Sequence, residues 1–315
     1  MNLRIFLPAL STACMAISAS AQTSPPWSHG ANDPAAQQGY VFRVPDVDNV
    51  PDMHGNPCDA RLVLFIGGNQ FFVLPQLVAA FERMHPDLKG HIFYETLPPG
   101  ILRRQMAAGN AITLGNLTIH VQPDVYEAGA RVLQTMEQAG QVSHIVNYAT
   151  NTLAIMVPRG NPKVIHGLGD LGRPGLRLSM PNPEWEGVAR QIQDSLRKAG
   201  GDALEHLVYE TKVRNGETML TEIHHRQTPM RILQGTVDAG VTWSSEVRFQ
   251  KSIGNPIEGV AVPDAQNATA IYAGGIVTGA LHPAAAHEWL SFLQSVEAQA
   301  IYHQYGFRSI TGTAK

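Results

Sequence analysis

A short polar loop between two apolar segments offers the most direct binding chemistry in this sequence. The apolar run 62–66 has the length and composition of a buried strand, and it breaks at Gly67 and Gly68. Asn69 and Gln70 follow, and apolar residues then recur at helical spacing. The first N–H groups of a helix lack intrahelical partners and the helix dipole is positive there, so Gly68, Asn69 and Gln70 could bind an anion or a polar solute group. A structural turn with Asn69 as a helix cap would have the same sequence.

Polar or small residues also follow two further strand candidates. Thr96 and Gly100 come after the next apolar run, and glycine at such a place lets a ligand approach the backbone closely. Asn116 and Thr118 lie near the end of the strand candidate 111–119. All four are candidate ligand contacts, although a plain Pro-Pro-Gly turn would explain Gly100 equally well.

One basic cluster and one aromatic residue extend this set of candidates. Arg226 directly follows His224 and His225. Its planar donor fork suits a carboxylate or an oxyanion, so we interpret Arg226 as a ligand or interlobe contact. A solvated polar loop would contain the same residues. Trp243 could stack on a ligand or close a cleft, or it could belong to the core.

The sequence contains no clear metal or catalytic signature. The two adjacent histidines lack the i,i+4 separation of a helical zinc pair, and Cys58 with His54 is an isolated pair in an irregular segment. There is no Gly-x-Ser-x-Gly elbow, no Gly-x-x-x-x-Gly-Lys loop and no spaced Cys/His set. We therefore predict a protein that is not an enzyme and that uses neither a metal nor a cofactor.

Strands and helices must alternate along the chain to position the candidate loops. The strand candidates are short apolar runs bounded by turn-forming residues, at 62–66, 91–94, 111–119, 152–157 and 176–180. Apolar residues at helical spacing follow several of them, and a last amphipathic helix is predicted over 287–305. Such alternation favours an α/β fold with parallel sheets and right-handed crossovers, in which ligands bind beyond the carboxyl ends of the strands.

The N-terminus indicates export from the cytoplasm. Arg4 precedes a short apolar run, and small residues at 19–21 fit a cleavage site, so residues 1–21 are predicted to be a signal peptide. Residues 22–60 are rich in Pro, Gly, Asn and Asp and are predicted to form an irregular extension, either packed on the folded body or attached as a tether. The chain has a net charge of −3 without a basic block, so we do not expect nucleic-acid binding.

Several segments together resemble a known family. They are 81–86, 153–162, 170–171, 234–246, 286–292 and 305–307. In order and spacing, from Leu62 to Phe307, the chain resembles bacterial periplasmic solute-binding proteins of the type II two-lobed fold, specifically the molybdate-binding group. The resemblance implies a monomeric periplasmic receptor that presents a small anionic or polar solute to the membrane permease of an ABC transporter.

The same resemblance implies a division into two Rossmann-like lobes. One lobe would comprise 61–147 and 265–315, and the other 148–264. Strands crossing near 146–153 and 261–278 would form the hinge between them. A small ligand bound between the lobes would then favour the closed conformation, because it would contact both.

The ligand is less well defined by this resemblance than the fold. The molybdate-binding family holds its oxyanion with neutral donors from several loops. In lobe 1 the matching positions here are Gly68, Asn69 and Gln70 in the first loop, and Thr96 and Gly100 in the second. In lobe 2 they are Trp185 in the loop 183–188, and Trp243 with Ser244 where the family has a tyrosine. Molybdate or tungstate is the leading expectation. Another oxyanion, a small carboxylate or other organic solute, and an accessory protein that uses the fold to bind a protein partner remain as alternatives.

Overall fold

The computed structural model describes residues 52–222 and 226–310. The predicted signal peptide, most of the predicted extension, and His224 and His225 lie outside these residues. Within the described ranges a sheet of 10 strands has the order β1-β3-β2-β6-β12-β7-β10-β8-β9, with β11 beside β7. No helix in these ranges is both long and apolar enough to cross a membrane.

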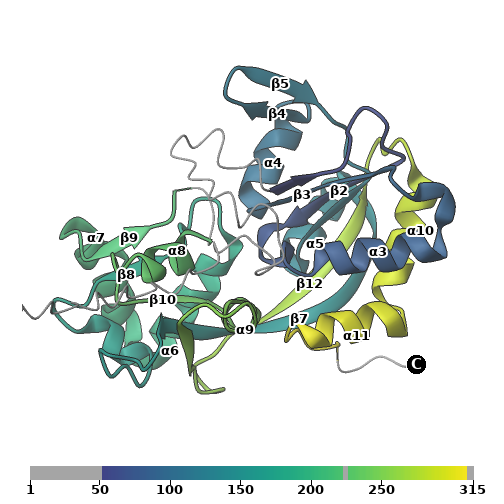
Figure 1. The fold of residues 1–315 in the computed structure, drawn as a ribbon. Coiled ribbons are helices and arrows are strands. Elements are labelled where there is room, and N and C mark those ends of the chain that lie inside the picture. Colours follow the sequence, from purple (N-terminus) through teal and green to yellow (C-terminus); the bar gives the residue numbers. More distant parts are fainter. Residues whose placement is uncertain (1–51, 223–225, 311–315) are drawn as a thin grey trace, which may run out of the picture.

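The sheet divides into two groups of strands, which we call lobe 1 and lobe 2. Lobe 1 contains β1 (Met53–His54), β2 (Leu62–Gly67), β3 (Ile92–Leu97), β6 (Val125–Gly129), β12 (Thr269–Val277) and the first part of β7 (Val142–Pro158). Lobe 2 contains the rest of β7 with β8 (Leu178–Met180), β9 (Thr218–Leu220), β10 (Ala239–Trp243) and β11 (Ile257–Ala261). Figure 1 shows the two lobes side by side, with β7 and β12 running between them.

Helices cover both lobes. Those of lobe 1 are α3 (Leu74–Met84), α4 (Pro99–Ala107), α5 (Ala130–Gln138), α10 (Pro283–Leu293) and α11 (Val296–Gln304). Those of lobe 2 are α6 (Gly187–His206), α7 (Lys212–Arg214), α8 (Gln227–Leu233) and α9 (Ser244–Ser252). Parallel pairs join β2 to β3 and β6 in lobe 1, and β8 to β9 and β10 in lobe 2. The predicted α/β fold with two lobes and crossing strands is therefore confirmed.

The first strand–loop–helix unit shows how the sequence produces this architecture. All residues of β2 are buried, because parallel strands lie on both sides of it and helices cover its faces. The chain then leaves the sheet through the short 3-10 turn Gly68–Gln70 and enters α3. Pro75 lies in the first turn of α3, where its missing N–H breaks no helical hydrogen bond, and Leu77 and Phe81 bury the inner face.

Two predicted elements were wrong in detail. The single strand predicted over 111–119 is a hairpin of β4 (Ala111–Leu114) and β5 (Leu117–His120). Gly115 has a φ of +59° at the first turn position, a conformation that glycine adopts without strain and that matches a tight hairpin. The helix predicted over 287–305 is two helices, because Ser295 accepts a hydrogen bond from the N–H of Ala298 and so caps a new helix start.

The end of the predicted extension packs on lobe 1. β1 pairs antiparallel with β3, and the ring of His54 stacks on Tyr94 at 4.5 Å between centroids. Asp52 is fully buried just before β1. The sequence left open whether the extension packs on the folded body or forms a tether. Its described part packs on lobe 1.

Candidate functional site

A cavity of about 1180 Å³ lies between the two lobes. Lobe 1 lines it with residues 67–69, 98–100 and 128–132, lobe 2 with 183–188 and Trp243, and the hinge region with 267–272. The lobe 1 segments follow β2, β3 and β6 directly, so the cavity lies at the carboxyl ends of parallel strands. This is where an open α/β sheet brings several loops together.

Among the described elements, four helices begin at this cavity. α4 and α5 start from lobe 1, and α6 and α9 start from lobe 2, with Pro98, Gly129, Glu186 and Trp243 as their N-cap residues. None of these four N-cap residues caps its helix with a side-chain hydrogen bond. First-turn N–H groups of α5, α6 and α9 and the positive dipole ends of all four helices therefore converge from both sides, which is an arrangement suited to an anion. α4 contributes its dipole alone, because Pro99 has no N–H and the N–H of Gly100 donates to the carbonyl of Trp185.

A chain of hydrogen-bonded polar side chains, which we call the polar chain, runs from the cavity lining to α9. The amide nitrogen of Asn69 donates to the hydroxyl of Tyr272 on β12, and the amide nitrogen of Asn151 on β7 donates to the same hydroxyl at 3.5 Å. Asn151 also donates to Ser245 Oγ at 2.7 Å, and its oxygen accepts from Ser244 Oγ at 3.0 Å. The chain thus connects the first loop of lobe 1, both crossing strands and the start of α9 in lobe 2.

A second polar network holds the first loop from beneath. Gln70 is fully buried, donates to Tyr148 at 2.8 Å and accepts from Tyr302 at 2.8 Å. Tyr148 and Trp289 donate to opposite oxygens of Glu127 at 2.8 and 2.7 Å. Burial raises the pKa of Glu127 to about 7, although these donors favour its ionised form. Gln70 therefore faces this network within lobe 1, and it positions the loop that Asn69 presents to the cavity.

The lobes touch at the mouth of the cavity. The N–H of Gly100 on α4 donates to the carbonyl of Trp185 at 3.0 Å. A Cβ atom at Gly100 would lie 2.6 Å from Trp185 Cα and 2.7 Å from its carbonyl oxygen, so only glycine permits this approach. Arg104 forms an exposed ion pair with Glu184 at 2.6 Å and lies over the Trp185 ring. α4 and the loop before α6 thus close one side of the cleft.

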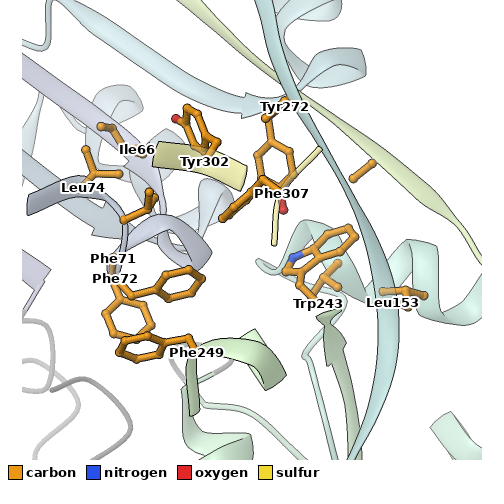
Figure 2. Close-up of a cluster of buried hydrophobic side chains, with 14 of the residues drawn as sticks. Ile66, Phe71, Phe72, Leu74, Leu153, Trp243, Phe249, Tyr272, Tyr302 and Phe307 are labelled. Carbon is orange, nitrogen blue, oxygen red and sulfur yellow. The ribbon is translucent and has the colours of Figure 1, made fainter. Parts of the chain in front are cut away.

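A further contact between the lobes is fully buried. Arg226 from lobe 2 forms an ion pair with Asp52, and both side chains are almost inaccessible, at 2% and 0%. Asp52 also accepts from Thr96 Oγ at 2.9 Å. Beside them Phe249 of α9 stacks on Phe72 at 4.6 Å, as Figure 2 shows. Arg226 therefore joins the lobes through Asp52.

The structure brings only part of the predicted site to the cavity. The residues that line it are Gly68, Asn69, Gly100, Trp185 and Trp243. Ser244 does not line the cavity and belongs to the polar chain, whereas Gln70, Thr96 and Arg226 are held in the buried contacts described above. Asn116 and Thr118 are exposed on the β4–β5 hairpin, where Thr118 bonds to Thr113, and the cavity does not include them.

Sequence reasoning missed several parts of the cavity, among them Tyr272, the start of α5 and the face of α6 from Arg190 to Lys198. Tyr272 lies on a crossing strand whose sequence gave no sign of a ligand contact. The start of α5 could have been found, because Val125, Tyr126 and Ala128 precede Gly129, and Leu133 and Met136 follow at helical spacing.

The lining also contains three arginines without an ion-pair partner among the described residues, alongside the acidic residues Glu184, Glu186 and Asp194. Arg103 and Arg131 from lobe 1 and Arg190 from lobe 2 line the cavity, and the guanidinium group of each forms no hydrogen bond or ion pair with another described residue. In the described ranges no group of three or more His, Cys, Asp or Glu side chains could hold a metal ion. The three unpaired guanidinium groups can attract an anion to the cavity.

Comparisons with known proteins are consistent with this geometry. A family model described as "Bacterial extracellular solute-binding protein" matches residues 62–308. The molybdate-binding protein ModA of Mycobacterium bovis is 27% identical over 240 residues, which cover 75% of this chain and 82% of that protein.

Two solved structures are similar in fold. The sulfate-binding protein SubI of Mycobacterium tuberculosis has a TM-score of 0.63 at 18% identity, covering 79% of this chain and 86% of that one. The periplasmic molybdate-binding protein of Azotobacter vinelandii has a TM-score of 0.63 at 16% identity, covering 78% of this chain and 98% of that one. At these identities the likeness establishes the two-lobed fold and not the ligand.

Proposed function

The chain belongs to the family of bacterial extracellular solute-binding proteins, and on that premise we propose that it binds a small oxyanion of the molybdate or tungstate kind between its lobes. In this proposal the protein is exported to the periplasm behind a cleaved signal peptide. It acts there as a monomer and delivers the anion to the permease of an ABC transporter.

The observation that carries the proposal is the convergence of helix starts on one cavity. α4 and α5 approach from lobe 1 and α6 and α9 from lobe 2, and none of the four has a side-chain cap. A tetrahedral oxyanion offers acceptor oxygens in four directions, so it can accept from both lobes at once. A ligand that contacts both lobes shifts the equilibrium toward the closed arrangement. The molybdate-binding relative at 27% identity supports an oxyanion of this size.

A thermal-unfolding screen tests the proposal. The purified protein would be heated with molybdate, tungstate, sulfate, phosphate or small carboxylates, and calorimetry would follow on each anion that shifts the transition. Binding to the native state at 100 times Kd adds about 2.7 kcal/mol, which is enough to raise Tm visibly. A concentration-dependent shift with molybdate or tungstate alone is the expected result. No shift with any anion would refute the proposal and favour an accessory protein that binds a protein partner.

One observation favours a second candidate, an organic anion that carries more than one acidic group. A tetrahedral oxyanion such as molybdate has five heavy atoms. At about 30 Å³ per atom, which is the volume that one water molecule takes up in the liquid, it occupies roughly 150 Å³. The cavity holds about 1180 Å³ and is lined by the three unpaired arginines, Arg103, Arg131 and Arg190. Organic phosphates and dicarboxylates therefore belong in the same screen. A larger Tm shift with these than with molybdate, reduced by Arg131→Ala or Arg190→Ala, would favour this candidate.

A further inference from the structure

We infer that the phenol hydroxyl of Tyr272, on the crossing strand β12, donates a hydrogen bond to the bound solute. The inference rests on the proposed function, because it requires an anionic acceptor in the interlobe cavity. Tyr272 would add to the site a residue of the hinge, separate from the helix N-termini of lobe 1 and of lobe 2.

Tyr272 is placed where a solute would meet it. It lines the cavity beside Asn69, and its ring packs edge-on against Trp243 at 6.0 Å between centroids. Figure 2 shows the tyrosine ring above the indole ring, with the hydroxyl on the side toward Trp243. The residue is 5% exposed, so its hydroxyl is shielded from bulk water and depends on near neighbours for hydrogen bonds.

The orientation of Asn151 fixes what the tyrosine oxygen does. The amide oxygen of Asn151 accepts from the backbone N–H of Thr152 at 3.0 Å and from Ser244 Oγ at 3.0 Å. A backbone N–H can only donate, so the amide oxygen must lie on this side and the amide nitrogen on the other. That nitrogen donates to Ser245 Oγ at 2.7 Å and to the Tyr272 hydroxyl at 3.5 Å.

A count of donors and acceptors then leaves one hydrogen unassigned. A phenol has one O–H donor and can accept from its lone pairs. With the amide nitrogen of Asn69 facing Tyr272, the Tyr272 oxygen accepts from both Asn69 and Asn151, and its own hydrogen has no acceptor among the described residues. Burial also raises the pKa of Tyr272 far above its ordinary value, so the hydrogen stays in place at any physiological pH.

An anionic oxygen in the cavity supplies the missing acceptor. Hydrogen bonds from O–H to a charged oxygen are short and about twice as strong as neutral ones. The two amides hold the hydroxyl in place before the solute arrives, so little ordering is needed on binding. Because Asn151 on β7 donates to the same hydroxyl, a solute bound to Tyr272 on β12 would also be linked to β7 through that amide.

The test compares Tyr272→Phe with the original protein by calorimetry against molybdate, tungstate, sulfate and phosphate. A hydrogen bond to a charged group contributes about 1.5–3 kcal/mol, so Kd should rise about 10- to 150-fold for each anion that the original protein binds. Tyr209→Phe is the matched control, because its hydroxyl is buried in lobe 2 without a hydrogen-bond partner and the cavity does not include it. Its Kd should equal that of the original protein.

A second measurement separates direct contact from a supporting role, since phenylalanine also removes the acceptor of Asn69 and Asn151. In protein labelled at tyrosine Cζ, saturating anion should bring the Tyr272 hydroxyl proton into slow exchange as a low-field resonance that Tyr272→Phe lacks. An unchanged Kd, or a raised Kd without that resonance, overturns the inference and leaves the proposed function standing. If the original protein binds none of the four anions, the proposed function and the inference both fail.

Discussion

Adding one methyl group at Gly100 should weaken solute binding without weakening the fold. Gly100 is the second residue of α4, and its N–H meets the carbonyl of Trp185 on the opposite lobe at 3.0 Å. An alanine Cβ would lie 2.6, 2.7 and 2.9 Å from the Cα, carbonyl oxygen and Cβ of Trp185. Two of these three atoms are backbone, so no change of side-chain rotamer relieves the clash. Gly100→Ala therefore acts on the contact between the lobes.

The size of the effect follows from the clash. Overpacking of this kind costs about 1–3 kcal/mol. If the closed arrangement is the one that binds, its reduced population raises the apparent Kd in proportion, by about 5- to 150-fold. Because the opposing atoms are largely backbone, we expect the upper half of that range. Alanine is also a better helix former than glycine, by up to about 1 kcal/mol, so Tm without ligand should stay unchanged or rise slightly.

Calorimetry with the best anion of the screen measures Kd, and X-ray scattering measures whether the lobes have moved apart. Gly169→Ala is the control, because a Cβ at Gly169 meets no atom within 4 Å and the residue lies outside the cavity. Equal Kd and equal radius of gyration for Gly100→Ala and the original protein would refute the reasoning. A large drop in Tm without ligand would show instead that the substitution disturbs lobe 1 itself.

Three further substitutions probe separate parts of the structure. Burial raises the pKa of Glu95 to about 8 in the folded protein. The unfolded chain loses this proton from about pH 4.5 upward, whereas the folded protein keeps it until about pH 8. The free energy of unfolding should therefore fall as the pH rises from 5 to 8. Glu95→Gln should make this fall smaller, which urea titrations at the two pH values would show. Arg104→Ala removes an exposed ion pair with Glu184, worth about 0–1 kcal/mol, and a contact with the Trp185 ring, worth about 0.5–1 kcal/mol, so Kd should change less than about 30-fold in calorimetry. Phe249→Ala removes a buried ring stacked on Phe72 and should lower the unfolding free energy by about 3–5 kcal/mol in urea titrations.

The fold could be predicted because short stretches of the sequence are enough to identify its strands and helices. Runs such as 62–66 and 152–157 are apolar and bounded by turn-forming residues, and the spacing of apolar residues changes after them. The structure contains strands at both places. The hairpin at 111–119 was missed although Gly115 and Asn116 separate two short runs, which is a recognised hairpin signal. Reading the run as one strand suggested a strand end near Asn116 and Thr118, whereas the structure places Asn116 in the turn and Thr118 in β5.

The site could be predicted only where a loop directly follows its strand. Asn69 and Gly100 meet this condition, and both line the cavity. The partner of Arg226 is Asp52, 174 residues away in sequence, so no local pattern could show that this arginine is engaged between the lobes. Tyr272 likewise depends on two amides, Asn69 and Asn151, that only the folded chain brings together.

The position of these contacts explains how solute binding and lobe closure are linked in the proposed receptor. Arg226 and Phe249 attach lobe 2 to lobe 1 in buried contacts with little exposure to water. The contact at Gly100 and Trp185 is different, because it lies at the mouth of the cavity and its nearby ion pair is exposed. Contacts that contribute little by themselves can open and close, so a solute held by the helix starts of both lobes needs to supply only a few kcal/mol to favour closure. The mouth at α4 and α6 is therefore the part of the cleft that we expect to move.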